Sequence, residues 1–269
     1  MKNKVVIITG ASSGIGKALA FECARRGATL SLAARDIAKL QEVGEELKKN
    51  GTEVLLVRTD VSREEECKNL VDRTLEKFGR IDVLVNNAGI SMRAIFEELD
   101  LDVIRKVMDT NFWGTAYCSR YAMSALLRSK GSLVAISSIA GVKGLPARSG
   151  YSASKFAIHG MLEVIRCETQ KQGLHVLIAC PGFTSSNIRF TALSADGSQQ
   201  GESPRDESKM MTSEEAAVHI CNAIEKRRRT LYLTPQGKLT YWLNKFFPAL
   251  LDKMVFKHMS KEPNTPLKQ

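Results

Sequence analysis

Cysteine and histidine are scarce and scattered in this chain. Six cysteines and four histidines are spread over 269 residues, and no two cysteines have C-x-x-C spacing. Disulfide-rich domains and zinc modules depend on closely spaced residues of these types. We therefore expect reduced cysteines that serve as packing residues, and no metal site.

The chain also lacks the marks of a secreted or membrane-spanning protein. Met1-Lys-Asn-Lys4 leads directly into a short apolar run, which does not resemble a signal peptide. The amphipathic stretch near the C-terminus is too short and too charged to span a bilayer. A cytoplasmic location is the expectation.

Acidic residues are fewer than basic ones, and the net charge is +10. Such an excess raises the question of nucleic-acid binding. The cluster Lys226–Arg229 ends a predicted helix, however, where cations oppose the helix dipole favourably. No nucleic-acid module accompanies it, and no base-stacking surface is indicated. Nucleic acid is therefore not an expected partner.

Short apolar runs alternate along the chain with longer, charged, periodic stretches. Apolar residues make up 43% of the sequence, and no linker divides it, so we predict a single domain over residues 1–269. The alternation predicts a three-layer α/β fold with a doubly wound, seven-stranded parallel sheet. The predicted strands are Val5–Thr9, Thr29–Ala33, Val54–Arg58, Ile81–Val85, Leu133–Ser137, Val176–Cys180 and Leu231–Leu233. The predicted helices include Lys17–Arg26, Ala38–Asn50, Ser62–Phe78 and Asp102–Ser129.

A glycine-rich turn, Gly10-Ala-Ser-Ser-Gly14-Ile-Gly16, joins the first predicted strand to the first predicted helix. Glycines let the backbone approach a pyrophosphate closely, and the free N–H groups at the helix start attract its charge. The spacing is Gly-x-x-x-Gly-x-Gly rather than the Gly-x-Gly-x-x-Gly of many dinucleotide folds. We predict a dinucleotide-binding turn, with a glycine turn that binds no ligand as the alternative.

Tyr151 and Lys155 stand four residues apart, and Ser138 lies thirteen residues before the tyrosine. On a helix the first two positions share a face, so a phenol and an ammonium would project into one site. A fixed positive charge lowers the pKa of a phenol toward the working range of an acid/base catalyst. The same pair also occurs on ordinary surface helices as a tyrosine beside a solvated lysine. Other motifs in the chain are therefore needed to distinguish an active site from a surface helix.

Several further motifs follow one another in a fixed order. They are Thr9-Gly10-x-x-x-Gly14-Ile-Gly16, Asp60-Val61, Asn86-Asn87-Ala88-Gly89, Asn111, Ser138 with Tyr151 and Lys155, and Pro181-Gly182. Through them the chain resembles the short-chain dehydrogenase/reductase family over roughly residues 4 to 235. Its C-terminal segment is also similar to the dehydrogenase/reductase member 7 branch. The resemblance implies a Rossmann fold and an oxidoreductase.

The resemblance implies a role for each catalytic residue. Tyr151 would exchange a proton with the substrate oxygen while hydride passes to or from the nicotinamide. Lys155 would lower the pKa of Tyr151 and hydrogen-bond the nicotinamide ribose. Ser138 would hold the substrate oxygen, with Ser137 as the less favoured candidate. Asn111 would bend its helix and anchor a water that connects Lys155 to solvent; a helix cap is the alternative for this residue.

The end of the second predicted strand indicates which dinucleotide binds. An enzyme that prefers NAD usually has a carboxylate there, whereas this chain has Ala34 followed by Arg35. A guanidinium suits the 2′-phosphate of NADP, so NADP(H) is predicted over NAD(H). Asp36 would repel that phosphate unless, as we predict, it caps the next helix.

The remaining cofactor contacts come from the resemblance. Asp60 and Val61 would flank the adenine. Asn86, Ala88 and Gly89 would lie along the adenosine ribose, with Asn86 mainly stabilising the sheet. The implied cofactor-binding residues are Gly10, Ser12, Ser13, Gly14, Ile15, Gly16, Arg35, Asp60, Val61, Asn86, Ala88, Gly89, Tyr151, Lys155, Pro181, Gly182 and Thr184.

The segment after Pro181-Gly182 departs from the family pattern. Many relatives have a branched aliphatic residue and then a threonine in this segment, whereas this chain reads Phe183-Thr184-Ser185-Ser186. Backbone contacts of Thr184 and the hydroxyl of Ser186 are the expected replacements at the nicotinamide carboxamide.

Substrate binding is predicted from two less regular regions. Residues 191–212 are polar and lack periodicity, which predicts a mobile substrate lid. The opposite wall would come from Ser91–Phe96 and Gly141–Pro146. The apolar residues Met92, Phe96, Val142, Leu145 and Phe183 favour a largely apolar substrate. Arg93 and Arg148 would either meet an anionic group or form charges at the rim.

Residues 236–259 have apolar side chains at helical spacing with lysines among them, which predicts an amphipathic C-terminal extension. Pro248 would kink it or split it into two helices. The apolar stripe would cover the substrate pocket or pack against a partner subunit; peripheral membrane contact is the alternative. The family resemblance implies a homodimer or homotetramer, formed through the helices around Asp102–Ser129 and Tyr151–Lys171.

These features predict an NADP(H)-dependent oxidoreductase that reduces a ketone, aldehyde or 3-oxoacyl carbonyl to an alcohol. Alcohol oxidation is the first alternative, because the same residues catalyse both directions. A nucleotide-binding regulatory protein without turnover is the second alternative, and the complete catalytic set argues against it.

Overall fold

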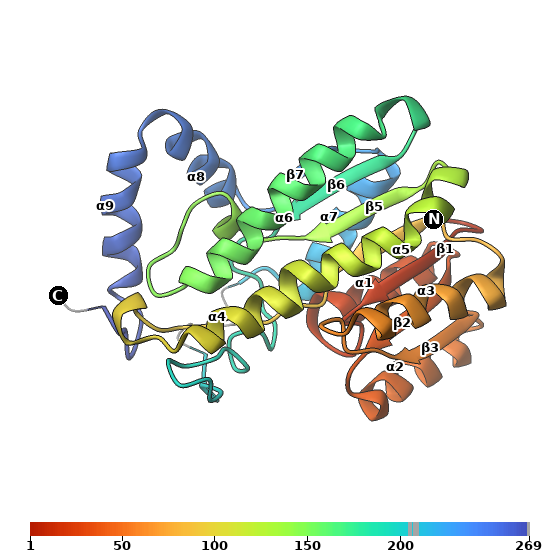
Figure 1. Ribbon diagram of the computed structural model, residues 1–269, viewed down its shortest axis with the longest axis horizontal. Helices are drawn as coiled ribbons and strands as arrows, with labels where there is room; N and C mark the ends of the chain where they lie inside the picture. The colour runs from red at the N-terminus through yellow and green to blue at the C-terminus, as the bar shows by residue number, and fades with distance from the viewer. Residues whose placement is uncertain (204–205, 207–209, 268–269) are drawn as a thin grey trace.

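One parallel sheet organises the protein. The computed structural model describes residues 1–203, 206 and 210–267, and within them seven strands lie in the order β3-β2-β1-β4-β5-β6-β7 (Figure 1). All neighbouring strands are parallel. The strands are β1 Val5–Thr9, β2 Thr29–Ala34, β3 Val54–Arg58, β4 Val83–Asn86, β5 Ser132–Ile136, β6 His175–Cys180 and β7 Thr230–Tyr232. The predicted doubly wound sheet is therefore confirmed.

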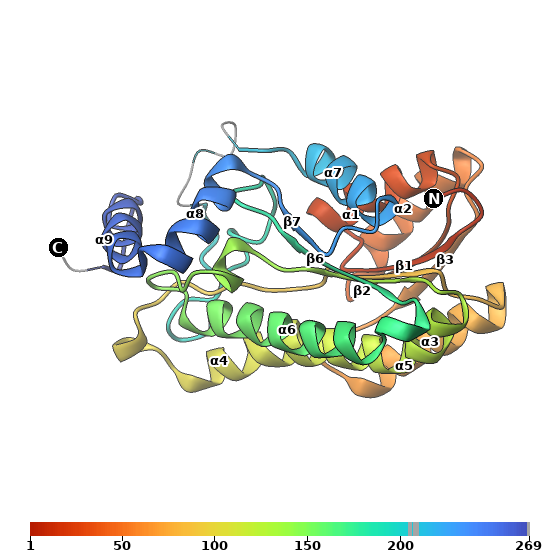
Figure 2. The same cartoon turned by 90° about the horizontal axis from the view of Figure 1, so that it is seen from above.

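Helices cover both faces of this sheet, which gives the three predicted layers. In Figure 2, α1, α2 and α7 lie on one face, and α3 to α6 lie on the other. Every residue of β1 is buried, as expected for a strand covered on both sides. The helices are α1 Gly14–Arg25, α2 Ile37–Lys49, α3 Glu64–Phe78, α4 Leu101–Met108, α5 Gly114–Arg128, α6 Ser149–Glu168 and α7 Ser213–Glu225. Short 3-10 helices lie at Phe96–Glu98, Ile139–Gly141 and Gln170–Gln172.

The predicted helix Asp102–Ser129 contains a change of pitch. A π-helical turn, Asp109–Trp113, lies between α4 and α5 and includes the buried Asn111. Such turns occur mostly as single insertions in α-helices, frequently at functional sites. The local bend expected around Asn111 therefore takes the form of a widened turn.

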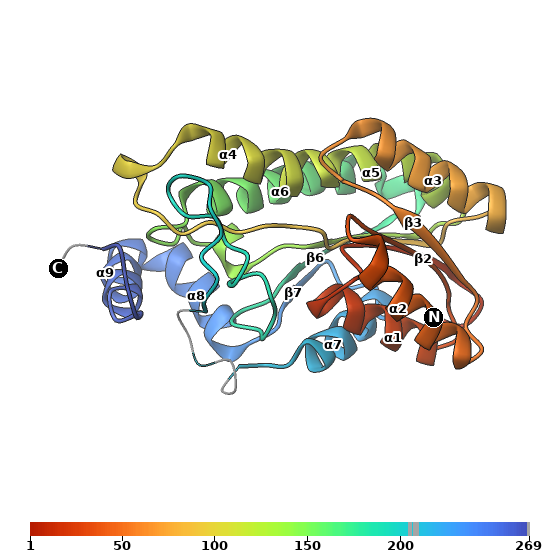
Figure 3. The ribbon, with the colours of Figure 1, turned by 90° about the horizontal axis from the view of Figure 1, so that it is seen from below.

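The C-terminal extension forms two helices, as predicted for a segment interrupted by Pro248. They are α8 Pro235–Phe246 and α9 Pro248–Met259, and proline stands at the start of each. Proline fits the first turn of a helix, where its missing N–H has no partner to lose. In Figures 1 and 3 both helices stand at one end of the molecule, opposite the end with α2 and β3. Among the described residues, no helix is long and apolar enough to cross a membrane.

Candidate active site

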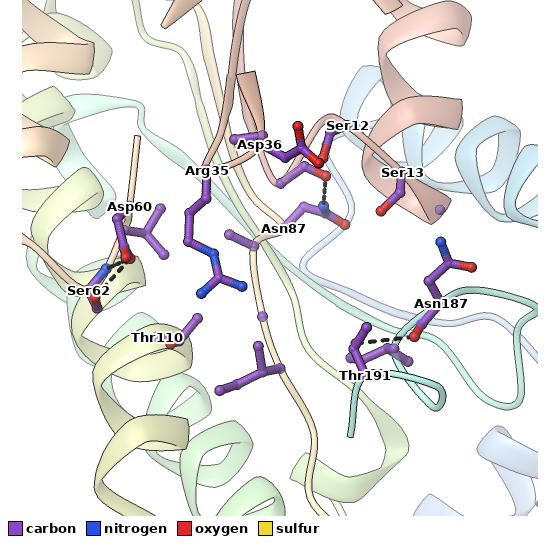
Figure 4. Close-up of a pocket in the computed structure, with 18 of the residues that line it drawn as sticks. Ser12, Ser13, Arg35, Asp36, Asp60, Ser62, Asn87, Thr110, Asn187 and Thr191 are labelled. Carbon is purple, nitrogen blue, oxygen red and sulfur yellow. Dashed lines mark hydrogen bonds between the residues drawn. The ribbon is translucent and has the colours of Figure 1, made fainter. Parts of the chain in front are cut away.

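A cleft of about 550 Å³ lies at the carboxyl ends of the strands. It is bordered by the glycine turn after β1, the end of β2, and the loops that follow β3 and β4 (Figure 4). The strand order reverses between β1 and β4, which is where dinucleotides bind in doubly wound sheets. The predicted residues in its wall are Gly10, Ser12, Ser13, Gly14, Arg35, Asp60, Val61, Ala88 and Gly89.

The glycine turn has the geometry of an anion site. Gly10 has a φ of +66°, and a Cβ on Gly16 would lie 2.2 Å from the Gly10 carbonyl oxygen. Both positions therefore need glycine. Among the described residues, the side chain of Ser13, which precedes α1, makes no capping hydrogen bond. The first N–H groups of α1 remain available for an anion, which fits a pyrophosphate.

Arg35 extends its guanidinium into the middle of the cleft (Figure 4). It is exposed, and it forms no ion pair with any residue in the described part of the chain. Asp36 accepts a hydrogen bond from the Lys39 N–H at 3.1 Å and caps α2, as predicted. The Lys39 ammonium also lies 3.6 Å from the Asp36 carboxylate. The negative charge of Asp36, next to Arg35, is thus offset by the N–H and the ammonium of Lys39 at the start of α2.

The other predicted adenosine contacts lie on the loops after β3 and β4. Asp60 accepts hydrogen bonds from the Ser62 N–H and hydroxyl at 3.0 and 2.8 Å, and both residues line the cleft. Val61 is buried beside them and also reaches the cleft wall. This part of the wall is therefore ordered by the loop's own hydrogen bonds.

Two adjacent asparagines, the last residue of β4 and the one after it, have different positions. Asn86 is buried below the cleft wall and donates to the Ser119 hydroxyl at 3.1 Å, in keeping with its predicted part in stabilising the sheet. Asn87 lines the cleft and donates to the Thr9 carbonyl at 2.9 Å. Its backbone N–H also donates to the Thr9 hydroxyl at 3.0 Å. Asn87, absent from the predicted set, therefore ties the glycine turn to the end of β4.

Ser138, Tyr151 and Lys155 meet at a second cavity of about 170 Å³, which shares wall residues with the cleft. Tyr151 and Lys155 project from the first turns of α6, and Ser138 follows β5. The Ser138 hydroxyl and the Tyr151 phenol both line this cavity. Lys155 Nζ lies 5.6 Å from the Tyr151 ring centroid and donates to the Ile136 carbonyl at 2.9 Å. The structure thus brings the three predicted residues together.

Asn111 reaches the same region from the π-helical turn. Its side chain accepts from the Ile90 N–H at 2.8 Å and donates to the Ile90 carbonyl and the Ser154 hydroxyl, both at 2.9 Å. A Cβ placed on Gly89 would lie 3.2 Å from Asn111 Oδ1 and 3.6 Å from Lys155 Nζ. Asn111 is thus no helix cap, since it lies inside a continuous helical segment next to Lys155. Its link to a water stays a prediction.

Burial sets the protonation of the pair. It lowers the pKa of Lys155 to about 8. It also raises the pKa of Tyr151, against the opposing effects of the Ser138 hydroxyl and of the charges of Arg189 and Arg148. The predicted lowering of the Tyr151 pKa is therefore wrong for this geometry, because desolvation outweighs the nearby cations. A phenol in this state is protonated at neutral pH and is ready to give a proton.

The nicotinamide end of the site follows β6. Pro181, Gly182 and Thr184 line the catalytic cavity, and Ser186 lines both cavities. Thr184 is buried, and its hydroxyl has no hydrogen-bond partner among the described residues. Buried hydroxyls are normally paired, so this one fits a polar ligand group such as a carboxamide. Ile15 lines the same cavity from the start of α1.

The two arginines of the predicted substrate wall bind a carboxylate of the chain itself. Glu262 follows α9 and forms ion pairs with both arginines. Its Oε2 lies 3.6 Å from Arg93 Nε and 3.4 Å from Arg148 Nη2. The side chains of Arg93 and Glu262 are only 4% and 5% exposed. The interpretation of Arg93 as a rim charge is therefore wrong. Sequence reasoning missed Glu262, because no local pattern connects it to arginines so distant in the chain.

The apolar wall differs from its prediction in part. Leu145 and Phe183 line the catalytic cavity, and Met259 joins them from the end of α9. Met92 instead is fully buried, with its sulfur accepting from the Gly150 N–H at 3.3 Å. Phe96 is 67% exposed and lies outside the cavity wall. The tail therefore supplies part of the surface that was assigned to the Ser91–Phe96 segment.

The predicted lid, residues 191–212, is described only in part. Residues 204–205 and 207–209 lie outside the described residues. Leu193 and Gln199 line the cofactor cleft, and the Arg93 N–H donates to the Leu193 carbonyl at 2.8 Å. The first half of the segment thus borders the cleft, and its function as a lid stays a prediction.

Comparison with known proteins gives a consistent result. Residues 4–196 match the family model described as short chain dehydrogenase. The 11-beta-hydroxysteroid dehydrogenase A of Sesamum indicum is 38% identical, over 99% of this chain and 78% of its own length. A dehydrogenase/reductase SDR family protein 7-like of Dictyostelium discoideum is 34% identical, over 96% of this chain and 83% of its own length.

Solved structures share the fold over most of the chain. A short chain dehydrogenase/reductase from Burkholderia phymatum in complex with NAD has a TM-score of 0.83 and 26% identity, and the match covers 100% of this chain and 99% of that one. An alcohol dehydrogenase from Thermococcus sibiricus complexed with 5-hydroxy-NADP has a TM-score of 0.75 and 26% identity. That match covers 86% of this chain and 95% of the other.

Proposed function

Since this chain belongs to the short-chain dehydrogenase family of oxidoreductases, we propose that it reduces a carbonyl compound to an alcohol with NADPH. The observation that supports this most directly is the meeting of Ser138, Tyr151 and Lys155 at a cavity next to the cofactor cleft. The proposal includes cofactor binding by the predicted set of cleft residues.

The proposed chemistry divides into a hydride and a proton. A bound nicotinamide would supply the hydride to the carbonyl carbon. Ser138 holds the carbonyl oxygen, and Tyr151 gives that oxygen its phenolic proton as the alcohol forms. Lys155 then stabilises the tyrosinate with its ammonium. The raised pKa of Tyr151 supports reduction over the alternative of alcohol oxidation, because oxidation needs the tyrosine deprotonated at the start.

The preference for NADPH rests on Arg35. Its guanidinium lies in the cleft, and the neighbouring Asp36 is engaged at the start of α2. An arginine fork binds a phosphate dianion through charge-assisted hydrogen bonds. One of the two similar solved structures contains NAD and the other an NADP derivative. The preference for NADPH is therefore argued from the residues of this chain.

The substrate proposed is a neutral, largely apolar ketone or aldehyde. Leu145, Phe183 and Met259 give the cavity an apolar wall. The relative from Sesamum indicum is named a hydroxysteroid dehydrogenase, and a hydroxysteroid is a largely apolar alcohol.

Replacement of the catalytic tyrosine tests the proposed function. Tyr151→Phe removes the proton donor, and we expect NADPH oxidation on a panel of carbonyl compounds to fall by about 100-fold or more. Affinity for NADPH, measured by fluorescence titration, should change little. Tyr121→Phe is the matched control, since its hydroxyl contacts Glu64 at the surface.

Two outcomes would contradict the proposal. Full activity of Tyr151→Phe would refute the assignment of the proton donor. A wild-type protein that binds NADPH but turns over no carbonyl or alcohol would favour the non-catalytic regulatory protein.

We also propose that the protein is cytoplasmic and contacts an anionic membrane surface through α8 and α9. Leu251 and Met259 face inward, in keeping with the predicted covering of the pocket. The large side chains of Leu239, Trp242, Phe246, Phe247 and Leu250 are between 53% and 61% exposed. Lysines at positions 238, 245, 253 and 257 accompany them, a pattern typical of interfacial helices.

Vesicle sedimentation tests the membrane contact. The wild-type chain should pellet with vesicles that contain phosphatidylglycerol, and Phe246→Glu with Phe247→Glu should remain in the supernatant. Phe96→Glu is the control, because Phe96 is equally exposed but lies outside α8 and α9. Equal pelleting of the double variant would eliminate this surface as the contact.

A homodimer or homotetramer is proposed through the face formed by the π-helical turn and α6. Trp113, Phe156 and Val164 are 46%, 46% and 55% exposed there. Light scattering should show an oligomer for the wild type and a smaller species for Phe156→Glu with Val164→Glu. A monomeric wild type would refute the proposal.

A further inference from the structure

Arg93, Arg148 and Glu262 contact one another beside the catalytic cavity, apart from Lys155, and we call them the Glu262 cluster. Arg148 and Glu262 line the cavity in which Tyr151 lies. The Arg148 side chain is 12% exposed, and the other two are nearly inaccessible. Ionised groups are rarely buried so completely without a structural or functional reason.

The two arginines are fixed by the frame of the active site. Arg148 directly precedes α6, three residues before Tyr151. Its backbone forms a parallel bridge with Ala94, whose N–H donates to the Ala147 carbonyl at 3.1 Å. Arg93 is the neighbour of Ala94 in the chain. The guanidiniums are thus attached to the catalytic helix and to a strand-like segment paired with its start.

Glu262 comes to this frame from the tail. It follows α9, and the Arg93 guanidinium donates a further hydrogen bond to the Pro263 carbonyl at 2.6 Å. The Arg148 bond to Glu262 is long at 3.4 Å, and Arg93 Nε has no hydrogen-bond partner among the described residues. The carboxylate therefore pairs with both arginines, and Arg93 Nε keeps a hydrogen-bonding capacity that the described residues do not meet.

A pair of guanidiniums beside an apolar cavity is the chemistry that recognises a carboxylic acid. Arginine forks match the two oxygens of a carboxylate, and the apolar wall of Leu145, Phe183 and Met259 suits the rest of such a molecule. In this protein the position opposite both arginines is held by the carboxylate of Glu262.

We propose that Glu262 is a specificity-determining residue that occupies the arginine pair and thereby restricts the cavity to neutral carbonyl compounds. An acid substrate must either displace Glu262 from its buried ion pairs or lie against its negative charge, and both are unfavourable. The inference rests on the proposed function only in taking this cavity as the substrate site.

The test compares an acid with its neutral isostere. Para-acetylbenzoate and para-acetylbenzamide have the same ketone and nearly the same shape, and differ in charge. Calorimetric titration should show that the wild type favours the amide. Glu262→Gln keeps the size of the side chain but removes its charge, and should shift the ratio of acid to amide affinity toward the acid by about 10- to 100-fold. The ratio of kcat/KM should move in the same direction, mainly through KM.

A second anchor of the tail provides the control. Asp252 on α9 pairs with Lys143, far less buried than the Glu262 cluster and separate from both arginines. Asp252→Asn should loosen α9 without changing the acid-to-amide ratio. An equal shift in Asp252→Asn, or no shift in a folded Glu262→Gln, would overturn the proposal.

Two further measurements keep the result interpretable. If Glu262→Gln fails to fold, Glu262→Asp retracts the carboxylate by one methylene and should shift the ratio in the same direction by less; no shift there also overturns the proposal. If no variant reduces either ketone while Glu262→Gln gains affinity for the acid, the proposed reaction is wrong and the assignment of Glu262 stands.

Discussion

Lys155 and Glu262 are both charged and buried beside one cavity, but their surroundings differ. Lys155 donates to the neutral carbonyl of Ile136, and burial lowers its pKa to about 8. Glu262 faces the two cations Arg93 and Arg148. A buried cation opposite a neutral acceptor is destabilised and can lose its proton near pH 8, whereas a buried carboxylate between two arginines is held by its ion pairs.

The difference separates a group used in chemistry from a group used for anchoring. Perturbed protonation at Lys155 suits proton transfer, because the group can change charge when Tyr151 does. The buried ion pairs of Glu262 suit an attachment of the tail to the frame of the active site. Substitutions at the two positions should therefore affect different properties of the protein.

Lys155→Met should have the largest effect on activity and almost none on stability. Loss of the ammonium should lower kcat/KM for carbonyl reduction by about 10²- to 10⁴-fold. The midpoint of thermal unfolding should stay the same or rise, because a desolvated charge is removed. Lys68→Met, at an exposed position on α3, is the control. A large loss of stability would show that Lys155 is an anchor after all.

Glu262→Ala should show the opposite pattern. Removing one member of a buried ion cluster leaves uncompensated charge, and we expect a loss of about 3–5 kcal/mol in the free energy of unfolding. Urea denaturation measures it. The double variant Arg93→Met with Glu262→Leu should lose less than the sum of the single variants. A loss below about 1 kcal/mol for Glu262→Ala would place it with surface ion pairs.

Arg35→Ser should change the choice of cofactor with a smaller effect. Without the guanidinium, the KM for NADPH should rise by about 10- to 100-fold, since a charge-assisted contact with the 2′-phosphate is lost. The KM for NADH should change little, and Arg58→Ser serves as a control on the adjacent strand. Equal changes for both cofactors would show that Arg35 does not select the phosphate.

The pH dependence should give the mildest effect. As pH rises above about 8, Lys155 loses its proton, so kcat/KM should fall. The free energy of unfolding should instead rise between pH 8 and 10.5. In this range the native state has released the Lys155 proton, whereas the unfolded state still binds it. Parallel urea titrations of wild type and Lys155→Met isolate this contribution. A fall in the wild-type stability relative to the variant would contradict the lowered pKa of Lys155.

Much of the fold could be predicted because its signals are local. Each predicted strand overlaps an observed one, since β-branched and leucine runs buried on both faces are recognisable without knowledge of their neighbours. The glycine turn was equally accessible, because Gly10 and Gly16 are required by contacts within one turn and its closest neighbours. The break at Pro248 follows from the chemistry of one residue.

The parts that were missed depend on contacts between distant segments. Glu262 lies in a tail without a distinctive motif, and its partners come from two other regions of the chain. The direction of the Tyr151 pKa depends on how deeply the folded protein buries the phenol, which a four-residue spacing does not reveal. Asn87 was overlooked because its bonds to Thr9 connect the segment after β4 to the end of β1.

The π-helical turn has a consequence for how this chain tolerates deletion. Removing one residue from Asp109–Trp113 would restore regular α-helical pitch, and all of α5 would then rotate by about 100° relative to α4. The contact of Asn111 with Ile90 and the contact of Gly114 with Val61 could then no longer form together. At Gly114 the fit is close, since a Cβ on this residue would lie 2.7 Å from a Val61 methyl. The extra residue thus lets one continuous helical segment place Asn111 next to the proton-transfer residues and Gly114 next to Val61 on the predicted adenine side of the cleft.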